Sequence, residues 1–271
     1  MLREITIGQY YPAQSPIHKL DPRVKLFATM IYIIALFAYK GIAGFALITL
    51  FLVGIIRLSQ VPFKFMVKGL KAILMLLLLT SLFNLFLTPG DTVYWSWGVL
   101  KLTDKGLINA ITMTLRLIYL ILGTSLMTLT TTPNQLTDAL ETSLRPLNKL
   151  HVPVHAIAMM MSIALRFIPI LIEETDKIMK AQMARGADFE NGNLLQKAKN
   201  MVPLLVPLFV SAFRRADDLA MAMEARCYNG GEGRTKMKPL EYNATDRKAY
   251  LLLFLFLAAV IALRIFLPFP Q

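Results

Sequence analysis

The sequence predicts an all-α membrane protein with about five transmembrane helices and three cytoplasmic amphipathic helices, two of them long. Three observations predict it: the composition, the length of the apolar runs and the distribution of positive charge. Hydrophobic residues make up 56% of the 271 residues and charged residues only 17%, whereas a soluble globular chain is about 45–50% apolar and about 25% charged. A soluble core of this size could not bury so much apolar surface, so the excess has to face lipid or other membrane helices.

Five apolar segments are long enough to be membrane spans, for which about 20 residues is usual. They are residues 24–39, 41–56, 69–88, 107–130 and 249–267. The fourth contains Arg116, which has to face the protein interior because an unpaired arginine in hydrocarbon is costly. The loop 89–106 between the third and fourth spans starts with a turn signal and alternates apolar and polar residues around Trp95 and Trp97. This pattern predicts a small hairpin on the outer surface.

The lysines and arginines orient these spans, because cytoplasmic loops of membrane proteins carry the excess of positive charge. A cytoplasmic N-terminus places residues 1–23, 57–68 and 131–248 inside, and the last of these holds sixteen lysines and arginines. The outside segments then hold only Lys40, Lys101 and Lys105. We therefore expect a multi-pass protein of the cell membrane whose N-terminus and long basic region are cytoplasmic and whose C-terminus is outside.

This topology divides the chain into three regions. They are an N-terminal transmembrane region with four spans (1–130), a cytoplasmic helical region (131–248) and a C-terminal transmembrane helix (249–271). The net charge of +12 follows the distribution expected for a membrane protein, and no recognised nucleic-acid module accompanies it. We therefore expect contact with membrane lipid and no nucleic-acid partner.

The region 131–248 contains apolar stretches interrupted by prolines and charges, which predicts amphipathic helices lying on or under the membrane. One runs from Leu136 to Leu150, after the helix start signal at Thr132 to Asn134. The other two are long, at about 154–185 and about 194–226. A helix of some 30 residues extends roughly 45 Å, which suits a span across the surface of another protein. The alternative, in which residues 154–172 form a sixth membrane span, stays open.

The two long helices end in the same pattern. The first ends Ala181-Gln182-Met183-Ala184-Arg185-Gly186 and the second Ala222-Met223-Glu224-Ala225-Arg226-Cys227, so the two arginines are 41 positions apart. Alanines three apart share a helix face and leave it low, so another surface can approach closely. Arginine in the last turn is favoured by the helix dipole and presents a planar fork of five donors. Two such ends in one region predict two similar docking sites, as on a dimeric partner, rather than two simple helix caps.

The chain carries further short motifs in a fixed order. They are the segment Leu20 to Leu26 before the first span, Thr132-Pro133 with the helix that follows, the segment Ala164 to Pro169 and the two Ala-Arg-Gly-type endings. With the hydropathy profile, this set resembles the transmembrane T component of energy-coupling factor transporters, which is related to the membrane subunit of cobalt-uptake systems. The resemblance covers nearly the whole chain. One departure is Cys227, where the family usually has glycine.

The resemblance implies a coupling subunit of a bacterial, ATP-driven uptake transporter for a vitamin or other micronutrient. Each arginine would dock one ATP-binding-cassette (ABC) ATPase subunit, and the cytoplasmic coupling helices would carry the motion of the ATPases to a small substrate-binding membrane subunit. The docking residues would be Ala184, Arg185, Gly186, Ala225, Arg226 and Cys227. Methionine packs adaptably, which suits contact with several interchangeable substrate-binding subunits; ordinary core or lipid packing is the alternative. The methionines in question are Met159, Met160 and Met161.

Other chemistry is not indicated by the sequence. It contains neither a phosphate-binding glycine loop nor a hydrolase motif, so we expect no enzymatic activity and no cofactor. His151 and His155 are separated by Pro153 and have no third ligand nearby, which argues against a metal site. Arg214 and Asp218 have the spacing of an ion pair on a helix. The rival function is a self-contained permease that binds substrate itself, which would need inverted repeats or broken helices at the bilayer midplane.

Overall fold

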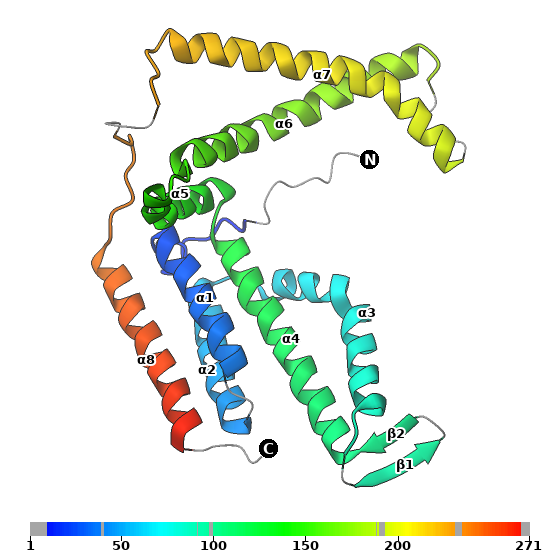
Figure 1. Ribbon diagram of the computed structural model, residues 1–271, viewed down its shortest axis with the longest axis vertical. Coiled ribbons are helices and arrows are strands. Elements are labelled where there is room, and N and C mark those ends of the chain that lie inside the picture. The colour runs from blue at the N-terminus through cyan, green and yellow to red at the C-terminus, as the bar shows by residue number, and fades with distance from the viewer. Residues whose placement is uncertain are drawn as a thin grey trace. The chain divides into compact units, whose positions relative to one another are not determined.

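The computed structural model describes residues 10–38, 41–90, 92–97, 100–187, 189, 193–230 and 235–266. The chain divides into two compact units (Figure 1). The bundle unit comprises Gly8–Ala139 and Leu240–Gln271, and the α6–α7 unit is built on Leu140–Pro239. Residues 1–9, Lys40 and the predicted end of the last span at Leu267 lie outside the described residues.

The bundle unit contains a helix at the position of each of the five predicted spans. They are α1 (Pro22–Ala38), α2 (Ile42–Ser59), α3 (Phe63–Leu87), α4 (Asp104–Thr130) and α8 (Ala244–Phe266). Between α3 and α4, strand β1 (Val93–Trp97) pairs antiparallel with β2 (Leu100–Thr103), which confirms the predicted hairpin. The Thr103 hydroxyl accepts a hydrogen bond from the Gly106 N–H at 3.0 Å and so caps the start of α4.

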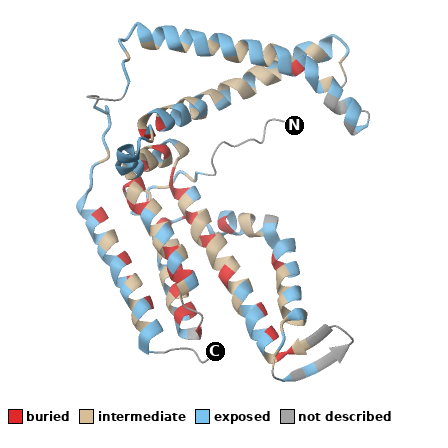
Figure 2. Cartoon of the chain, viewed as in Figure 1, coloured by how far each residue is buried: buried red, intermediate tan, exposed pale blue. Residues whose placement is uncertain are grey.

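The core of the bundle unit lies where α1, α2, α4 and α8 meet, and buried residues line these helices in Figure 2. The rings of Phe51 and Phe256 stack there with their centroids 4.0 Å apart. Tyr32 of α1 packs against Gly123 of α4, where a Cβ atom would overlap the tyrosine ring. The Tyr32 hydroxyl also donates to the Tyr119 carbonyl at 2.9 Å. The close approach of α1 to α4 therefore depends on a glycine.

Three described helices are long and apolar enough to cross a membrane: α4, α6 (Val154–Ala184) and α8. The bent helix α3 is a fourth if its parts Phe63–Lys71 and Ile73–Leu87, which meet at 62°, form one broken span. With 17 residues, α1 is about 26 Å long, which is short for a hydrocarbon core about 30 Å thick. The protein is an all-α membrane protein, while the count of five spans stays a prediction.

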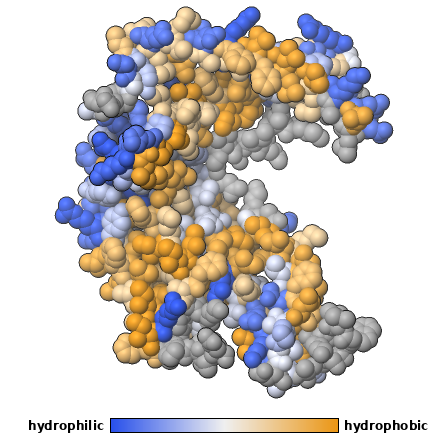
Figure 3. Space-filling view, viewed as in Figure 1, coloured by the Kyte–Doolittle hydropathy of each residue, from blue (hydrophilic) through white to orange (hydrophobic). Residues whose placement is uncertain are grey.

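Apolar side chains are exposed on the helices of the bundle unit, as expected for contact with lipid. Figure 3 shows hydrophobic residues over the visible faces of α3 and α8. Among the exposed side chains are Met75 and Leu78 of α3 and Leu251 and Leu255 of α8. The first half of α6 is also rich in exposed apolar residues, and α6 has the length and hydropathy of a span. The alternative of a sixth span at 154–172 therefore stays open.

The α6–α7 unit is built around two helices of 31 residues each, α6 and α7 (Leu194–Glu224). Their bounds confirm the two predicted long helices, which continue through three internal prolines, Pro169, Pro203 and Pro207. The predicted helix before them is α5 (Pro133–Leu144), which continues as the 3₁₀ helix η2 (Arg145–Leu150). Pro146 lies at the start of η2, where its missing N–H is tolerated.

Candidate functional site

The end of α6 closes in a Schellman motif around Arg185. The Gly186 N–H donates to the Met183 carbonyl at 2.9 Å, and the Ala187 N–H donates to the Gln182 carbonyl at 3.0 Å. Gly186 adopts φ +87°, the left-handed conformation that this motif requires and that glycine takes without strain. Arg185 is therefore the last residue before the chain turns away from the helix axis.

The end of α7 repeats this geometry 41 residues later. The Cys227 N–H donates to the Glu224 carbonyl at 2.8 Å, and the Tyr228 N–H donates to the Met223 carbonyl at 3.0 Å. Cys227 adopts φ 54° in the place of the glycine. The departure from glycine at this position thus leaves the backbone of the second helix end matched to the first, with Arg226 in the place of Arg185.

Both helix ends are exposed, and their surfaces are alike. The side chains of Arg185 and Arg226 are exposed, as are the small residues Ala184 and Ala225 that precede them. Within the described residues, neither arginine forms an ion pair. Each end therefore offers a free five-donor fork beside a low helix face, which can enter a narrow groove and bind carboxylates or carbonyls there.

The two helices cross at equivalent positions. Arg215 Nη2 donates to Glu174 Oε2 at 3.2 Å, and these two residues are also 41 positions apart. The Gln182 side chain donates to the Pro203 carbonyl at 3.5 Å, so α6 and α7 run in opposite directions past each other. The described residues contain no ion pair between Arg214 and Asp218, the pair that the helical spacing suggested. The neighbouring Arg215 binds Glu174 of α6 instead.

A contact between equivalent positions of two repeats lies on the axis that relates them, so the two helix ends project from the crossing by equal lengths. Arg185 lies 11 residues beyond Glu174, and Arg226 lies 11 residues beyond Arg215. Eleven residues of α-helix correspond to about 16 Å. The two ends consequently lie on opposite sides of the α6–α7 unit (Figure 1).

Apolar side chains are exposed on both long helices between their ends. Met160 and Met161 are exposed on the first half of α6 and Met159 is half-buried. A longer apolar face runs along α7 with spacings of four residues, and Figure 2 shows few buried residues on this helix. Its exposed members are Met201, Val202, Leu205, Val206, Phe209, Val210 and Phe213. Residues four apart share one side of a helix, so these side chains form one continuous strip.

A polar cluster holds the segment after α7 against the start of α6. Glu141 of α5 binds His155 Nδ1 at 2.8 Å and Lys236 Nζ at 2.7 Å. Burial opposes ionisation of this carboxyl, but the hydrogen bonds from Lys236 and His155 hold the pKa of Glu141 below its usual range. His155 is thus engaged by a carboxylate, and His151 instead ends η2 with φ 61°.

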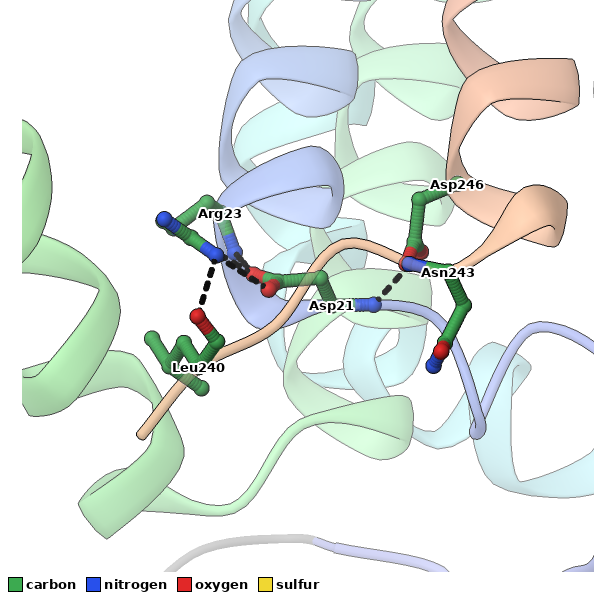
Figure 4. A network of polar contacts seen from close by, with 5 residues as sticks. All are labelled: Asp21, Arg23, Leu240, Asn243 and Asp246. Atoms are coloured by element: carbon green, nitrogen blue, oxygen red, sulfur yellow. Dashed lines mark hydrogen bonds and ion pairs between the residues drawn. The ribbon is translucent and has the colours of Figure 1, made fainter. Parts of the chain in front are cut away.

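In the bundle unit, a second polar network joins the starts of α1 and α8 (Figure 4). Asp21 binds Arg23 through two bonds, Nε to Oδ1 at 3.0 Å and Nη2 to Oδ2 at 2.7 Å. Arg23 also donates to the Leu240 carbonyl at 3.0 Å. The fully buried Asp246 accepts from the backbone N–H groups of Asp21 at 2.9 Å and Asn243 at 2.7 Å. The network fixes the position at which the chain re-enters the bundle before α8.

Lys25 and His18 hold the segment before α1 against the end of α4. The Lys25 ammonium donates to the carbonyls of Thr130 at 2.8 Å and His18 at 3.1 Å. The His18 ring contacts the Ser15 hydroxyl at 2.6 Å and the Tyr11 carbonyl at 3.0 Å. Burial lowers the pKa of His18, so this ring is neutral where it packs.

Arg116 in the middle of α4 is only 8% exposed, which confirms that it faces the protein interior. Its guanidinium lies 5.4 Å from the Phe37 ring centroid and 6.0 Å from that of Phe45. Aromatic faces attract cations, so α1 and α2 supply rings that accommodate the charge. Within the described residues its Nε atom has no hydrogen-bond partner.

Comparison with known proteins agrees with these features. The sequence matches the family model described as "Cobalt transport protein" over residues 13–237. The energy-coupling factor transporter transmembrane protein EcfT of Clostridium kluyveri is 57% identical over 247 residues, covering 91% of this chain and 92% of the relative. EcfT of Thermosediminibacter oceani is 53% identical over 250 residues, covering 92% and 94%. EcfT of Bacillus subtilis is 48% identical over 264 residues, covering 97% and 100%. The chain belongs to the family of energy-coupling factor transporter transmembrane proteins.

Two features of the structure were not predicted from the sequence. The first is the contact of Asp246 with Asp21, which are 225 residues apart; the local signal was Asn243 three residues before Asp246, a helix-start pattern. The second is the exposed apolar strip along α7 from Met201 to Phe213. Its spacing of four residues was readable as one helix face.

Proposed function

We propose that this energy-coupling factor family member is the non-catalytic coupling subunit of a vitamin or micronutrient uptake transporter. Arg185 and Arg226 each dock one ABC ATPase subunit, and the ATPases, not this chain, hydrolyse ATP. The observation that supports this most directly is the pair of matched, exposed helix ends at equal distances from one crossing. Two equal ends suit two similar subunits. A role as a simple helix cap would give no reason for the same ending to occur on both helices.

The crossed helices would work as two levers. When ATP binding draws the ATPases together, each docked arginine moves with its groove, and a rigid helix carries the displacement about 16 Å back to the crossing. The bond between Glu174 and Arg215 at 3.2 Å would hold the levers together there. Motion at the two ends would then reach the crossing in equal measure.

The apolar surfaces of α6 and α7 would receive the substrate-binding membrane subunit. Met159, Met160 and Met161 and the strip from Met201 to Phe213 offer exposed apolar area without direction-specific hydrogen bonds. Methionine adapts its shape to different partners, so several interchangeable subunits could use the same surface. We place this unit and the N-terminus in the cytoplasm and the C-terminus outside, as the positive-charge distribution favours.

The test is charge reversal at each helix end in the assembled transporter. Arg185→Glu or Arg226→Glu is expected to remove one ATPase and reduce uptake at least tenfold, and the double variant is expected to lose both ATPases. Lys177→Glu and Arg214→Glu are matched controls, since both residues are exposed cations on the same helices, away from the ends. Co-purified ATPase and substrate uptake are measured, with membrane insertion checked for every variant.

Two results would contradict the proposal. Normal ATPase content and uptake in the double variant would reduce the two motifs to helix caps. Tight substrate binding by the purified chain without partners would favour the rival permease function. Arg185→Lys adds detail to the test, because it keeps the charge but loses the planar fork, and an intermediate loss of ATPase would indicate that the fork itself is recognised.

A further inference from the structure

A cavity of about 320 Å³ lies in the bundle unit between α1, α2, α4 and α8. Its walls are mostly apolar and include Val24, Phe51, Leu126 and Leu253. Ligand pockets range from about 300 to 1,000 Å³, so the cavity has room for one slender ligand. A partner α-helix, which is about 10–12 Å across with its side chains, is too wide to enter the cavity.

Most polar residues of the cavity gather at one end. They are Lys25 at the start of α1, Thr130 at the end of α4, and Thr245 and Lys248 at the start of α8, while Thr29 and Tyr32 lie further along α1. Lys25 is 5% exposed, and its ammonium donates to two carbonyls but, within the described residues, forms no ion pair. An ammonium carries three donors. A buried ammonium with spare donor capacity therefore borders an apolar space, and the carboxylates of Asp21 and Asp246 lie near enough to interact with its charge.

The cavity opens toward α2 and α8. Leu58 and Leu252 line it and are themselves 54% and 50% exposed, and Lys248 is exposed beside them. The apolar part of α8 begins directly after Lys248. A lysine at the end of an apolar helix segment lies at the level of lipid headgroups, so the opening faces lipid with its charge at headgroup depth.

We propose that this groove binds one anionic phospholipid, with an acyl chain along the apolar wall and the phosphate at Lys248 and the Lys25 end. Basic pockets between transmembrane helices on the cytoplasmic side bind anionic headgroups. Water has few hydrogen-bond partners along the apolar wall, away from the lysine end. Among the described residues, two lysines and no carboxylate line the groove, which distinguishes an anionic lipid from a zwitterionic one.

The inference goes beyond the proposed ATPase docking and does not depend on it, since every lining residue belongs to the bundle unit. The lipid would contact α1, α2, α4 and α8 together, beside the network of Asp21 and Asp246. It would therefore stabilise the same end of the bundle that this network fixes. Loss of the lipid is expected to loosen α8 without removing the ATPases.

Native mass spectrometry of the assembled transporter tests the proposal, with phosphatidylglycerol and phosphatidylcholine supplied at equal concentration. The unmodified protein is expected to retain one phosphatidylglycerol in preference to phosphatidylcholine. Lys248→Gln is expected to reduce this preference about fivefold, the contribution of one lysine near an anionic surface. Arg247→Gln is the matched control, because Arg247 is the adjacent exposed cation and does not line the groove.

Ala249→Phe is the second variant, because Ala249 lines the groove and a phenyl ring there would occupy it. This variant is expected to lose both lipids. The proposal is overturned if Lys248→Gln keeps the same preference for phosphatidylglycerol as Arg247→Gln. It is also overturned if Ala249→Phe retains as much phosphatidylglycerol as the unmodified protein. A photo-crosslinker at Leu252 that joins a peptide of another subunit instead of lipid would also overturn it. Should Ala249→Phe not assemble, the two charge variants decide the outcome alone.

Discussion

The two helix ends carry different residues at the left-handed position that closes each motif, and this difference predicts opposite effects of two substitutions. Gly186 and Cys227 occupy the same place in matched Schellman motifs, with φ +87° and φ 54°. The left-handed conformation costs a non-glycine residue roughly 1–2 kcal/mol. Glycine loses part of this advantage through its larger conformational entropy in the unfolded chain. Cys227→Gly is therefore expected to stabilise the end of α7 by about 1 kcal/mol, and Gly186→Ala to destabilise the end of α6 by the same amount.

Side-chain contacts at the two positions do not alter the expected stability changes. A Cβ atom at Gly186 would meet no other atom within 4 Å, and the Cys227 side chain is exposed. Hydrogen exchange measures the local effect at the amides that close each motif. The Tyr228 amide is expected to gain about fivefold protection in Cys227→Gly, and the Ala187 amide to lose about fivefold in Gly186→Ala, which is what 1 kcal/mol gives. Changes of the same sign, or none, would refute the matched geometry of the two ends.

Three further predictions concern the bundle unit. Asp246→Ala is expected to lower the free energy of unfolding by about 3 kcal/mol, because the buried N–H of Asp21 and the partly buried N–H of Asn243 lose a charged acceptor. Thermal melting of the purified protein would show this loss, and Asp246→Asn should lose less. Gly123→Ala is expected to cost about 1–3 kcal/mol through overlap with Tyr32, whereas Gly54→Ala, whose Cβ meets nothing within 4 Å, should be neutral or stabilising in the same melts. Burial lowers the pKa of His18 from 6.5, so the folded state binds this proton less readily than the unfolded state. The contribution of neutral His18 to stability is then complete above about pH 6.5 and decreases as the pH falls below it. His18→Gln is expected to reduce the pH dependence of the melting temperature over that range.

The elements with strong local signals could be predicted from the sequence. The long helices follow from their apolar spacing and from the stops at Gly186 and Cys227, and their bounds agree with the structure within two residues. The hairpin followed from the turn signal and alternation around Trp95. The inward orientation of Arg116 could be predicted because exposing a charge to the hydrocarbon of a bilayer is costly. In each case, the information lies within a few residues of the element it determines.

Features that depend on tertiary contact could not be predicted in the same way. Arg214 and Arg215 are equivalent in sequence terms, and only the crossing of α6 with α7 selects Arg215 to bind Glu174. The number of spans depends on helices of 17 and 18 residues, whose length lies at the lower limit for a bilayer. The contact of Asp21 with Asp246 joins residues at opposite ends of the chain, and no periodicity announces such a pair.

If the helix ends dock ATPases as proposed, their matched backbones limit how this chain could distinguish two different ATPases. Because both ends close with the same hydrogen bonds and each places its arginine 11 residues from the crossing, the shape and reach of the ends do not discriminate. Discrimination would have to come from side chains, such as the exposed pair Met183 in one end and Glu224 in the other. An exposed carboxylate beside Arg226 makes that end less positive than the end at Arg185. Two identical ATPases would bind the ends unequally for this reason, whereas two different ATPases could each match the charge of its own end.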